Sequence, residues 1–315
     1  MSLYLGIDTS NYTTSLAAYD SDRNEMISLR RLLPVKEGER GVRQNEAVFL
    51  HTQALPDLFS EMASRADMRD IAAVGCSDRP CDEDGSYFPC FTVGIAAARE
   101  AGALSCAPVY ANSHQQGHIA AVLFSANRTD LINETFTAFH VSGGTTQAVL
   151  VTPDEKKILS TRLLASSLDL CAGQAVDRLG NMLSLPFPSG KYVEELASKS
   201  AAKFRIRPFM RDGSPSISGL ENKCRDMLSG GEAKEDVCLY CLKYIEEALS
   251  LMLEHIQKSV GAGLPVVFSG GVMSDAIIRQ GLSEKYDCVF GKPEYSTDNA
   301  AGTAYLAYLK HKRGL

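Results

Sequence analysis

An α/β fold with two lobes around a nucleotide cleft is predicted by three observations. A unit of strand, polar turn and strand occurs at the N-terminus and recurs at residues 139–151. Short apolar segments alternate with longer segments of helical period in both halves of the chain. The turns Ser142-Gly143-Gly144 and Ser269-Gly270-Gly271 each follow an apolar run directly. Such turns bring bare backbone N–H groups close to an anion such as phosphate.

The repeated units open the two halves of the chain. In both, an apolar strand leads into a polar turn and a second strand, and the segments 13–18 and 145–150 read alike. This repetition indicates a duplicated lobe. The expected strands are Leu3–Ile7, Ser15–Tyr19, Phe139–Val141, Gln147–Val151 and Val266–Phe268.

Helical spacing of apolar residues places helices between and after these strands. The expected helices are Glu46–Met62, Thr92–Gly102, Val237–Val260, Ser274–Leu282 and Asn299–Lys310. The segment Cys76–Cys90 contains Pro80, Gly85 and Pro89 and is expected to be a loop. We assign residues 1–112 and 294–315 to the N-terminal lobe and residues 113–293 to the C-terminal lobe.

Composition narrows the function class. The chain has 315 residues and a net charge of −6, which excludes a broadly basic nucleic-acid surface, so any RNA contact has to be local or supplied by a partner. Its nine cysteines are scattered and odd in number, which favours a reducing cytoplasm over a disulfide framework. The N-terminus lacks signal-peptide character, and no apolar run is long enough to span a membrane. We therefore expect a cytoplasmic protein without membrane contact.

Two histidines, His114 and His118, stand four residues apart. On a helix they share one face, so both imidazoles can reach one metal ion, although such a pair is about as often an ordinary exposed face. The zinc peptidase pattern requires an acid beside the first histidine, and Gln115 occupies that place. His140 and Asp298 are the best candidates for further ligands, and the set suits iron or zinc.

Asp177 and a basic segment are candidates of a different kind. Asp177 is either a solvated helix acid or a carboxylate that accepts hydrogen bonds from ribose hydroxyls. Residues 199–211 hold five basic side chains around Phe204 and Phe209. Such a run can contact RNA phosphates and bases, but more often it is a solvated face, which we favour at this point. Cys238 and Cys241 are read as core packing.

At these residues the chain resembles the tRNA threonylcarbamoyladenosine transferases, which have the actin, Hsp70 and sugar-kinase (ASKHA) fold. The similarity runs from Leu5-Gly6-Ile7-Asp8-Thr9-Ser10 to Thr297-Asp298-Asn299-Ala300-Ala301. Between them lie matching segments at residues 112–118, 141–144, 172–177, 218–220 and 269–272. The order and spacing of these segments make the resemblance specific.

The resemblance implies a role for each matching residue. His114, His118 and Asp298 match metal ligands, and His140 falls where some members have a metal-binding tyrosine. A group of residues corresponds to the nucleotide site, with Asp275 near the base: Ser142, Gly143, Gly144, Asp177, Gly190, Gly270, Gly271 and Asp275. The implied reaction is attack of a tRNA adenosine amine, next to the anticodon, on threonylcarbamoyl-adenylate. We take Asp8, the remaining polar group, as the candidate catalytic residue.

The implied cofactors are one divalent metal (iron or zinc, with magnesium a further option) and ATP or an AMP-type adenylate. The implied partners are tRNA, bound directly or through partner proteins, and other tRNA-modification subunits or a family paralogue in a hetero-oligomer. The chain departs from the family pattern at Tyr12, Thr13, Thr145, Gln174 and Asp275. A non-catalytic paralogue that binds nucleotide and metal as an assembly partner therefore remains open, with an actin-fold kinase or a metallopeptidase as weaker alternatives.

Overall fold

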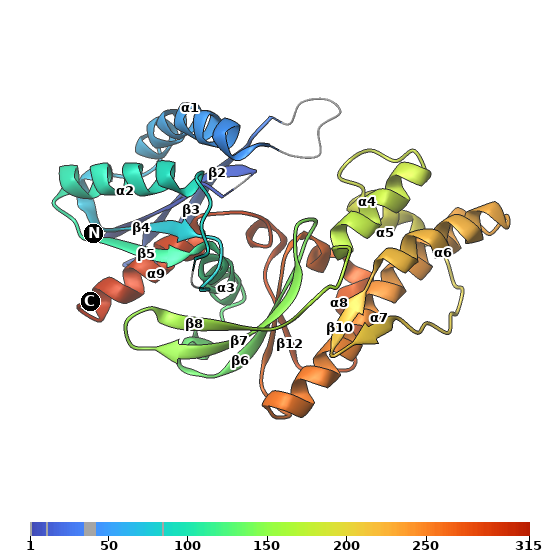
Figure 1. The fold of residues 1–315 in the computed structure, drawn as a ribbon. Helices are drawn as coiled ribbons and strands as arrows, with labels where there is room; N and C mark the ends of the chain where they lie inside the picture. The colour runs from blue at the N-terminus through green and yellow to red at the C-terminus, as the bar shows by residue number, and fades with distance from the viewer. Residues whose placement is uncertain (1, 11, 35–41, 84) are drawn as a thin grey trace. The chain divides into compact units, whose positions relative to one another are not determined.

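The computed structural model describes residues 2–10, 12–34, 42–83 and 85–315, which form two compact units (Figure 1). Unit 1 comprises Met1–Glu134, Val151–Arg162 and Glu294–Leu315, and unit 2 comprises Thr135–Leu150 and Leu163–Pro293. The boundary that we predicted at residue 113 differs from this division. Residues 113–134 group with unit 1 because helix α3 (His114–Ser125) packs against helix α9 (Ala301–Lys312).

Unit 1 is built on a five-stranded sheet in the order β3-β2-β1-β4-β5. Its strands are β1 (Leu3–Asp8), β2 (Thr13–Asp20), β3 (Glu25–Leu32), β4 (Ile71–Arg79) and β5 (Val109–Ser113). The central strand β1 pairs antiparallel with β2 and parallel with β4. Because side chains alternate between the faces of a strand, Leu5 and Ile7 join the core beneath helices α1 (Gln44–Ala63) and α2 (Phe91–Ser105). Gly6 faces α9 on the other side.

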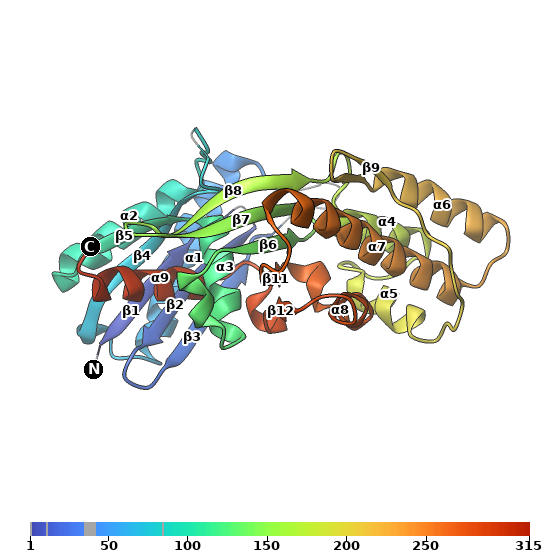
Figure 2. The ribbon, with the colours of Figure 1, turned by 90° about the horizontal axis from the view of Figure 1, so that it is seen from below.

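Unit 2 contains a second five-stranded sheet in the order β12-β11-β6-β7-β8. The strands are β6 (Phe136–Val141), β7 (Thr146–Asp154), β8 (Ile158–Ser166), β11 (Val266–Ser269) and β12 (Cys288–Phe290). The helices are α4 (Ala172–Met182), α5 (Gly190–Ala197), α6 (Ser218–Ser229), α7 (Lys234–Val260) and α8 (Ala276–Ser283). The core gathers Phe139 and Phe268 from the sheet with Leu249 and Met252 from α7, the long helix in Figure 2. A small hairpin of β9 (Phe209–Arg211) and β10 (Ser214–Ser216) completes the unit.

The predicted strands and helices are confirmed within a few residues at each end. One prediction is partly wrong, since Cys76–Arg79 finishes strand β4 and only the rest of the Cys76–Cys90 segment is a connection. The turn-forming residues begin only at Pro80, and the buried Cys76 lies opposite Ile7 of the parallel neighbour β1. Cys238 and Cys241 are buried, as expected of core residues. In the described part of the chain, no helix is long and apolar enough to cross a membrane.

Candidate functional site

A capped helix start fixes the two histidines. Ser113 ends β5 and caps α3: its hydroxyl accepts a hydrogen bond from the Gln116 backbone N–H at 3.2 Å. The Gln116 side chain accepts one in return from the Ser113 N–H at 2.8 Å, which completes a capping box. His114 is therefore the first helical residue, and His118 lies one turn further on the same face.

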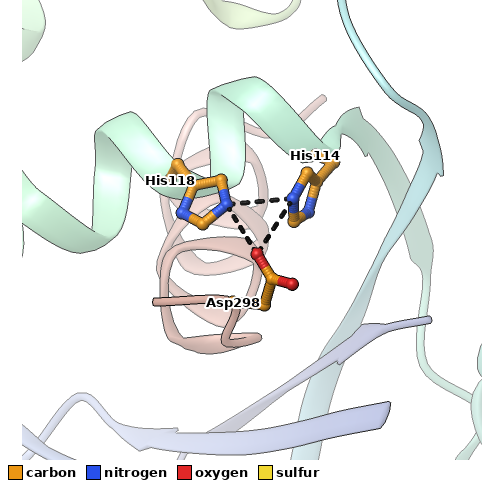
Figure 3. Close-up of side chains that lie close together, drawn as sticks. All are labelled: His114, His118 and Asp298. Carbon is orange, nitrogen blue, oxygen red and sulfur yellow. Dashed lines mark hydrogen bonds and ion pairs between the residues drawn. The ribbon is translucent and has the colours of Figure 1, made fainter. Parts of the chain in front are cut away.

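Asp298 meets both histidines (Figure 3). The Nε2 atoms of His114 and His118 lie 2.9 Å apart, and each faces the same oxygen, Oδ1 of Asp298. The distances from that oxygen are 3.6 Å to His114 and 3.3 Å to His118. These three were predicted as metal ligands from the sequence, and the structure brings them together.

The geometry of the three ligand atoms suits a small divalent cation. In a tetrahedral site with metal–ligand bonds of 2.0–2.1 Å, neighbouring ligand atoms are separated by about 3.4 Å. The two distances to the Asp298 oxygen fall close to that value, and the distance between the two nitrogens is somewhat shorter. Two imidazoles and one carboxylate also match the donor preferences of iron and zinc. The residues present therefore fit a metal ion.

Asp8 orients the first histidine from behind. Its carboxylate ends β1, is buried, and lies 3.0 Å from Nδ1 of His114, while Ser10 donates its hydroxyl to the other oxygen at 2.7 Å. Burial alone would raise the pKa of Asp8, but the charge of His114 and these hydrogen bonds hold it below the usual value. A carboxylate behind a ligating imidazole fixes its tautomer and strengthens it as a ligand.

The His114 ring thus has a carboxylate at each nitrogen. Burial opposes its protonation, yet Asp8 and Asp298 together raise the pKa of His114 to about 10. The pKa of Asp298 lies well below the usual range, since its hydrogen bonds to His114 and His118 outweigh its own burial. The site therefore favours positive charge between these groups, and a metal ion would replace the proton on Nε2.

Thr13 is a neighbour of the site that sequence reasoning missed as a contributor. Its hydroxyl lies 3.4 Å from the second oxygen of Asp298. From the sequence, Thr13 is only a departure from the pattern of the family that the chain resembles. Because Thr13 and Asp298 are 285 residues apart, no local pattern could reveal this contact.

Two glycines, Gly302 and Gly6, let helix α9 approach helix α3 and strand β1 closely, and this places Asp298 just before α9. A Cβ built on Gly302 would lie 1.8 Å from the carbonyl oxygen of Gly117, so the two backbones touch here. Gly6 of β1 likewise leaves room for α9, since a Cβ there would lie 2.4 Å from the Ala304 nitrogen. Asp298 does not cap α9. Asn299 instead accepts the hydrogen bond from the Ala301 N–H, and this leaves the Asp298 carboxylate for the histidines.

The other predicted site residues belong to unit 2. His140 lies in β6, and its Nδ1 is 2.9 Å from the Ser269 hydroxyl at the end of β11. The three-residue cluster of unit 1 forms without it. Its role as a fourth metal ligand remains a prediction.

The first Ser-Gly-Gly turn is ordered by its own serine. The Ser142 hydroxyl accepts hydrogen bonds from the N–H groups of Gly144 and Thr145 at 3.3 and 3.1 Å. The Ser142 carbonyl accepts one from Gly173 at the start of α4. A Cβ on Gly143 or Gly144 would meet no atom within 4 Å. The turn is thus held firmly on one side and opens to free space on the other.

The remaining candidates lie directly after strand β11 and in helices α4 and α5 of unit 2. Gly270 follows β11 with φ +98°, and a Cβ there would lie 2.2 Å from the Val141 carbonyl oxygen, so glycine is needed for packing. Gly271, in contrast, has open space at its Cβ position. Asp177 of α4 accepts a hydrogen bond from the Ser189 N–H at 2.9 Å, directly before Gly190. Burial raises the pKa of Asp177.

Asp275 caps helix α8 by accepting a hydrogen bond from the Ile278 N–H at 2.9 Å. Glu194 of α5 accepts a second one from Ala276, so two carboxylates gather at this helix start. Burial, supported by the charge of Glu194, raises the pKa of Asp275 to about 6. No local sequence pattern identifies Glu194 as a neighbour of Asp275.

Comparison with known proteins identifies a matching family and several relatives. The family model described as TsaD, tRNA N6-adenosine threonylcarbamoyltransferase, matches residues 32–305. A tRNA N6-adenosine threonylcarbamoyltransferase of Neorickettsia sennetsu is 28% identical, with 99% of this chain and 94% of the relative covered. A probable bifunctional tRNA threonylcarbamoyladenosine biosynthesis protein of Methanocaldococcus jannaschii is 25% identical; the match covers 98% of this chain and 56% of that protein.

Solved structures are similar in fold at much lower identity. Component A of the (R)-2-hydroxyglutaryl-CoA dehydratase of Acidaminococcus fermentans superposes with a TM-score of 0.59 and 16% identity over the whole of both chains. A ROK family protein of Streptococcus pneumoniae gives a TM-score of 0.51 and 15% identity over 99% of this chain and all of that one. These similarities concern the fold alone, and the predicted actin-like α/β fold is confirmed.

Proposed function

The chain belongs to the tRNA N6-adenosine threonylcarbamoyltransferase family, and from that membership we propose that it transfers a threonylcarbamoyl group from threonylcarbamoyl-AMP to a tRNA adenosine beside the anticodon. The observation that carries the proposal furthest is the convergence of the His114, His118 and Asp298 ligand atoms, all within 4.8 Å of one another. A family match alone would also fit a chain that had lost its metal centre.

In this proposal His114, His118 and Asp298 hold one divalent metal ion, either iron or zinc, with His140 as a further candidate ligand. A bound metal would supply Lewis-acid polarisation of the carbamoyl group and a fixed point for orienting it. Asp8 keeps the His114 ring in position through Nδ1, and Thr13 holds the free oxygen of Asp298. The chain's own contribution is therefore a preorganised set of ligands.

We assign the adenylate to the glycine turns of unit 2. The phosphate would approach the open side of Ser142–Gly144, the ribose hydroxyls would meet Asp177 and Gly190, and the base would lie near Gly270, Gly271 and Asp275. In the reaction the adenosine amine forms a bond to the carbamoyl carbon. The bond from that carbon to the phosphate oxygen breaks, AMP leaves, and one amine proton is released. Holding both reactants in place can provide a large part of the rate enhancement.

The decisive test is reconstitution. The purified chain is combined with tRNA, threonine, bicarbonate, ATP and an adenylate-forming enzyme, with and without candidate partner subunits, and nucleosides are analysed by mass spectrometry. We expect threonylcarbamoyladenosine when partners are present, and loss of product with Asp298→Asn. Product formation that persists unchanged in Asp298→Asn would contradict the role of the metal site.

A second candidate is a non-catalytic paralogue that binds metal and nucleotide within an assembly. One observation favours it: Asp8, a polar group at the site, already engages both its oxygens with His114 and Ser10. Thr13 and Gln174 supply no carboxylate to accept the amine proton. Tight metal and nucleotide binding without product in the fully reconstituted mixture would establish this alternative.

A further inference from the structure

A row of basic side chains lines one face of an extended segment in unit 2. Residues 201–208 connect α5 to strand β9 without helix (Figure 2). The exposure of the side chains alternates along the segment. The odd-numbered positions are exposed and the even-numbered ones are half-buried or buried. The exposed members are Lys203, Arg205, Arg207, Phe209 and Arg211. Side chains that alternate in this way are about 6–7 Å apart along an extended chain, so the row forms a ladder of charge.

The other face of the segment is fixed to the core. The Phe204 ring packs edge-on against Tyr240 of α7, with ring centroids 5.2 Å apart. Ile206 and Met210 also pack on the unit 2 core. Pro208 restricts Arg207 to extended conformations, which keeps the alternation in phase. The basic row is therefore held in one geometry before any ligand binds, and this reduces the entropic cost of binding.

The four cations of the row are available for a ligand. In the described parts of the chain, none of them forms an ion pair with an acidic side chain, whereas the nearby Lys199 lies 3.5 Å from Glu195. Four positive charges lie within residues 203–211 in a protein with a net charge of −6. Phe209 is 65% exposed between Arg207 and Arg211.

We propose that this basic row binds the sugar–phosphate backbone of the tRNA substrate. The choice of tRNA as the bound polymer rests on the proposed function. Lys203, Arg205, Arg207 and Arg211 contact successive phosphates, and Phe209 stacks on an unpaired base. A run of cations with an aromatic ring among them matches single-stranded nucleic acid better than an acidic protein, because a protein offers no bases to stack. This local surface also resolves how an acidic chain contacts RNA.

Two variants test the row by different signatures, using fluorescence anisotropy of a labelled tRNA transcript with the full-length chain. Arg205→Gln/Arg207→Gln should weaken binding about tenfold at low salt and reduce the slope of log K against log salt by about 1.4–1.8, since each phosphate contact contributes about 0.7–0.9. Phe209→Ala should weaken binding about tenfold with an unchanged slope, because stacking releases no counterions. Arg205→Lys/Arg207→Lys should keep most of the affinity and the full slope.

The matched control is Arg162→Gln/Lys258→Gln, which removes two positive charges from exposed positions elsewhere. Equal affinity and slope in the control and in Arg205→Gln/Arg207→Gln would overturn the proposal. If Arg205→Gln/Arg207→Gln loses binding to polyglutamate or to anionic vesicles but keeps its binding to tRNA, the proposal is also overturned and the row has another partner. If the parent protein binds tRNA through these residues yet yields no modified adenosine under full reconstitution, the proposal for the basic row is supported and the proposed transferase function is contradicted. If Arg205→Gln/Arg207→Gln forms modified adenosine with the parent KM for tRNA, the transferase function is supported and the proposal that the basic row binds tRNA is contradicted.

Discussion

The metal centre of unit 1 and the Ser142–Gly144 turn of unit 2 use glycine in opposite ways. In unit 1, Gly6 and Gly302 lie where a single added carbon would meet backbone atoms at 2.4 and 1.8 Å. In unit 2, Gly143 and Gly144 face open space. One region uses glycine to bring helices together so that side chains can do chemistry. The other uses it to keep space free, with backbone groups at its edge. Substitution of the same residue type is therefore expected to cause a folding defect at Gly302 and a binding defect at Gly143.

The largest effect is expected from Gly302→Ala. Alanine is the better helix former, yet its methyl group would press on the Gly117 backbone and force α3 and α9 apart. We expect unit 1 to lose at least about 3 kcal/mol of stability, together with its metal affinity. Thermal unfolding and metal analysis measure both. Gly219→Ala in α6, where the added methyl meets no atom within 4 Å, is the control. Equal melting temperatures for the two variants would refute the packing argument.

His114→Ala separates the metal centre from the fold around it. The ring contributes a ligand nitrogen and the contact to Asp8, so we expect metal affinity to fall by more than about 100-fold, beyond the usual effect of removing a supporting residue. Circular dichroism should show a folded chain. His311→Ala, at an exposed position in α9, should keep its metal. Elemental analysis that finds full metal content in His114→Ala would disprove the site.

The two units should also respond to acid in opposite directions. Burial of His51 in α1, where its Nδ1 lies 2.8 Å from the Thr14 hydroxyl, lowers its pKa to about 4 from 6.5. The unfolded state then binds the proton more tightly, so this contribution to unit 1 is present above pH 6.5 and is lost as the pH falls towards 4. Asp275 has the opposite effect, because its pKa is raised from 3.8 to about 6 in the folded protein. Its contribution to the free energy of unfolding of unit 2 is present below pH 3.8 and is lost as the pH rises through 6.

Each contribution is on the order of 2 kcal/mol. Hydrogen exchange, corrected for intrinsic rates and measured between pH 4 and 7, can follow α1 and α8 separately. His51→Gln should flatten the dependence in α1 alone, and Asp275→Asn should flatten it in α8 alone. A parallel response of both helices in the parent protein would show that the two units do not titrate independently.

Sequence reasoning found those parts of the site that have a local pattern. The i, i+4 spacing identified His114 and His118, and the apolar runs before the Ser-Gly-Gly turns identified strands β6 and β11. It did not find the contact of Thr13 with Asp298 or the contact of Gly302 with Gly117, because each contact joins segments that are far apart in the sequence. The basic row was visible as composition only. The alternation of buried and exposed positions, which makes it a surface, depends on how Phe204 and Met210 pack in the folded chain.

The smallest effect, and the sharpest test of the comparison, is expected from Gly143→Val. Because a Cβ at this position meets no atom, valine should fold without a cost, in contrast to alanine at Gly302. Its methyl groups would occupy the open side of the turn that we assign to the phosphate, so an AMP-type adenylate should bind at least about tenfold more weakly, or about 1.4 kcal/mol. Calorimetry with ATP and AMP measures this, with Ala233→Val at an exposed position of the same unit as control. An unchanged nucleotide affinity with an unchanged melting temperature would remove the turn from the site. A fall in melting temperature would instead show that Gly143 has a packing role, as Gly270 has in the same unit, and the contrast between the turn and the metal centre would fail.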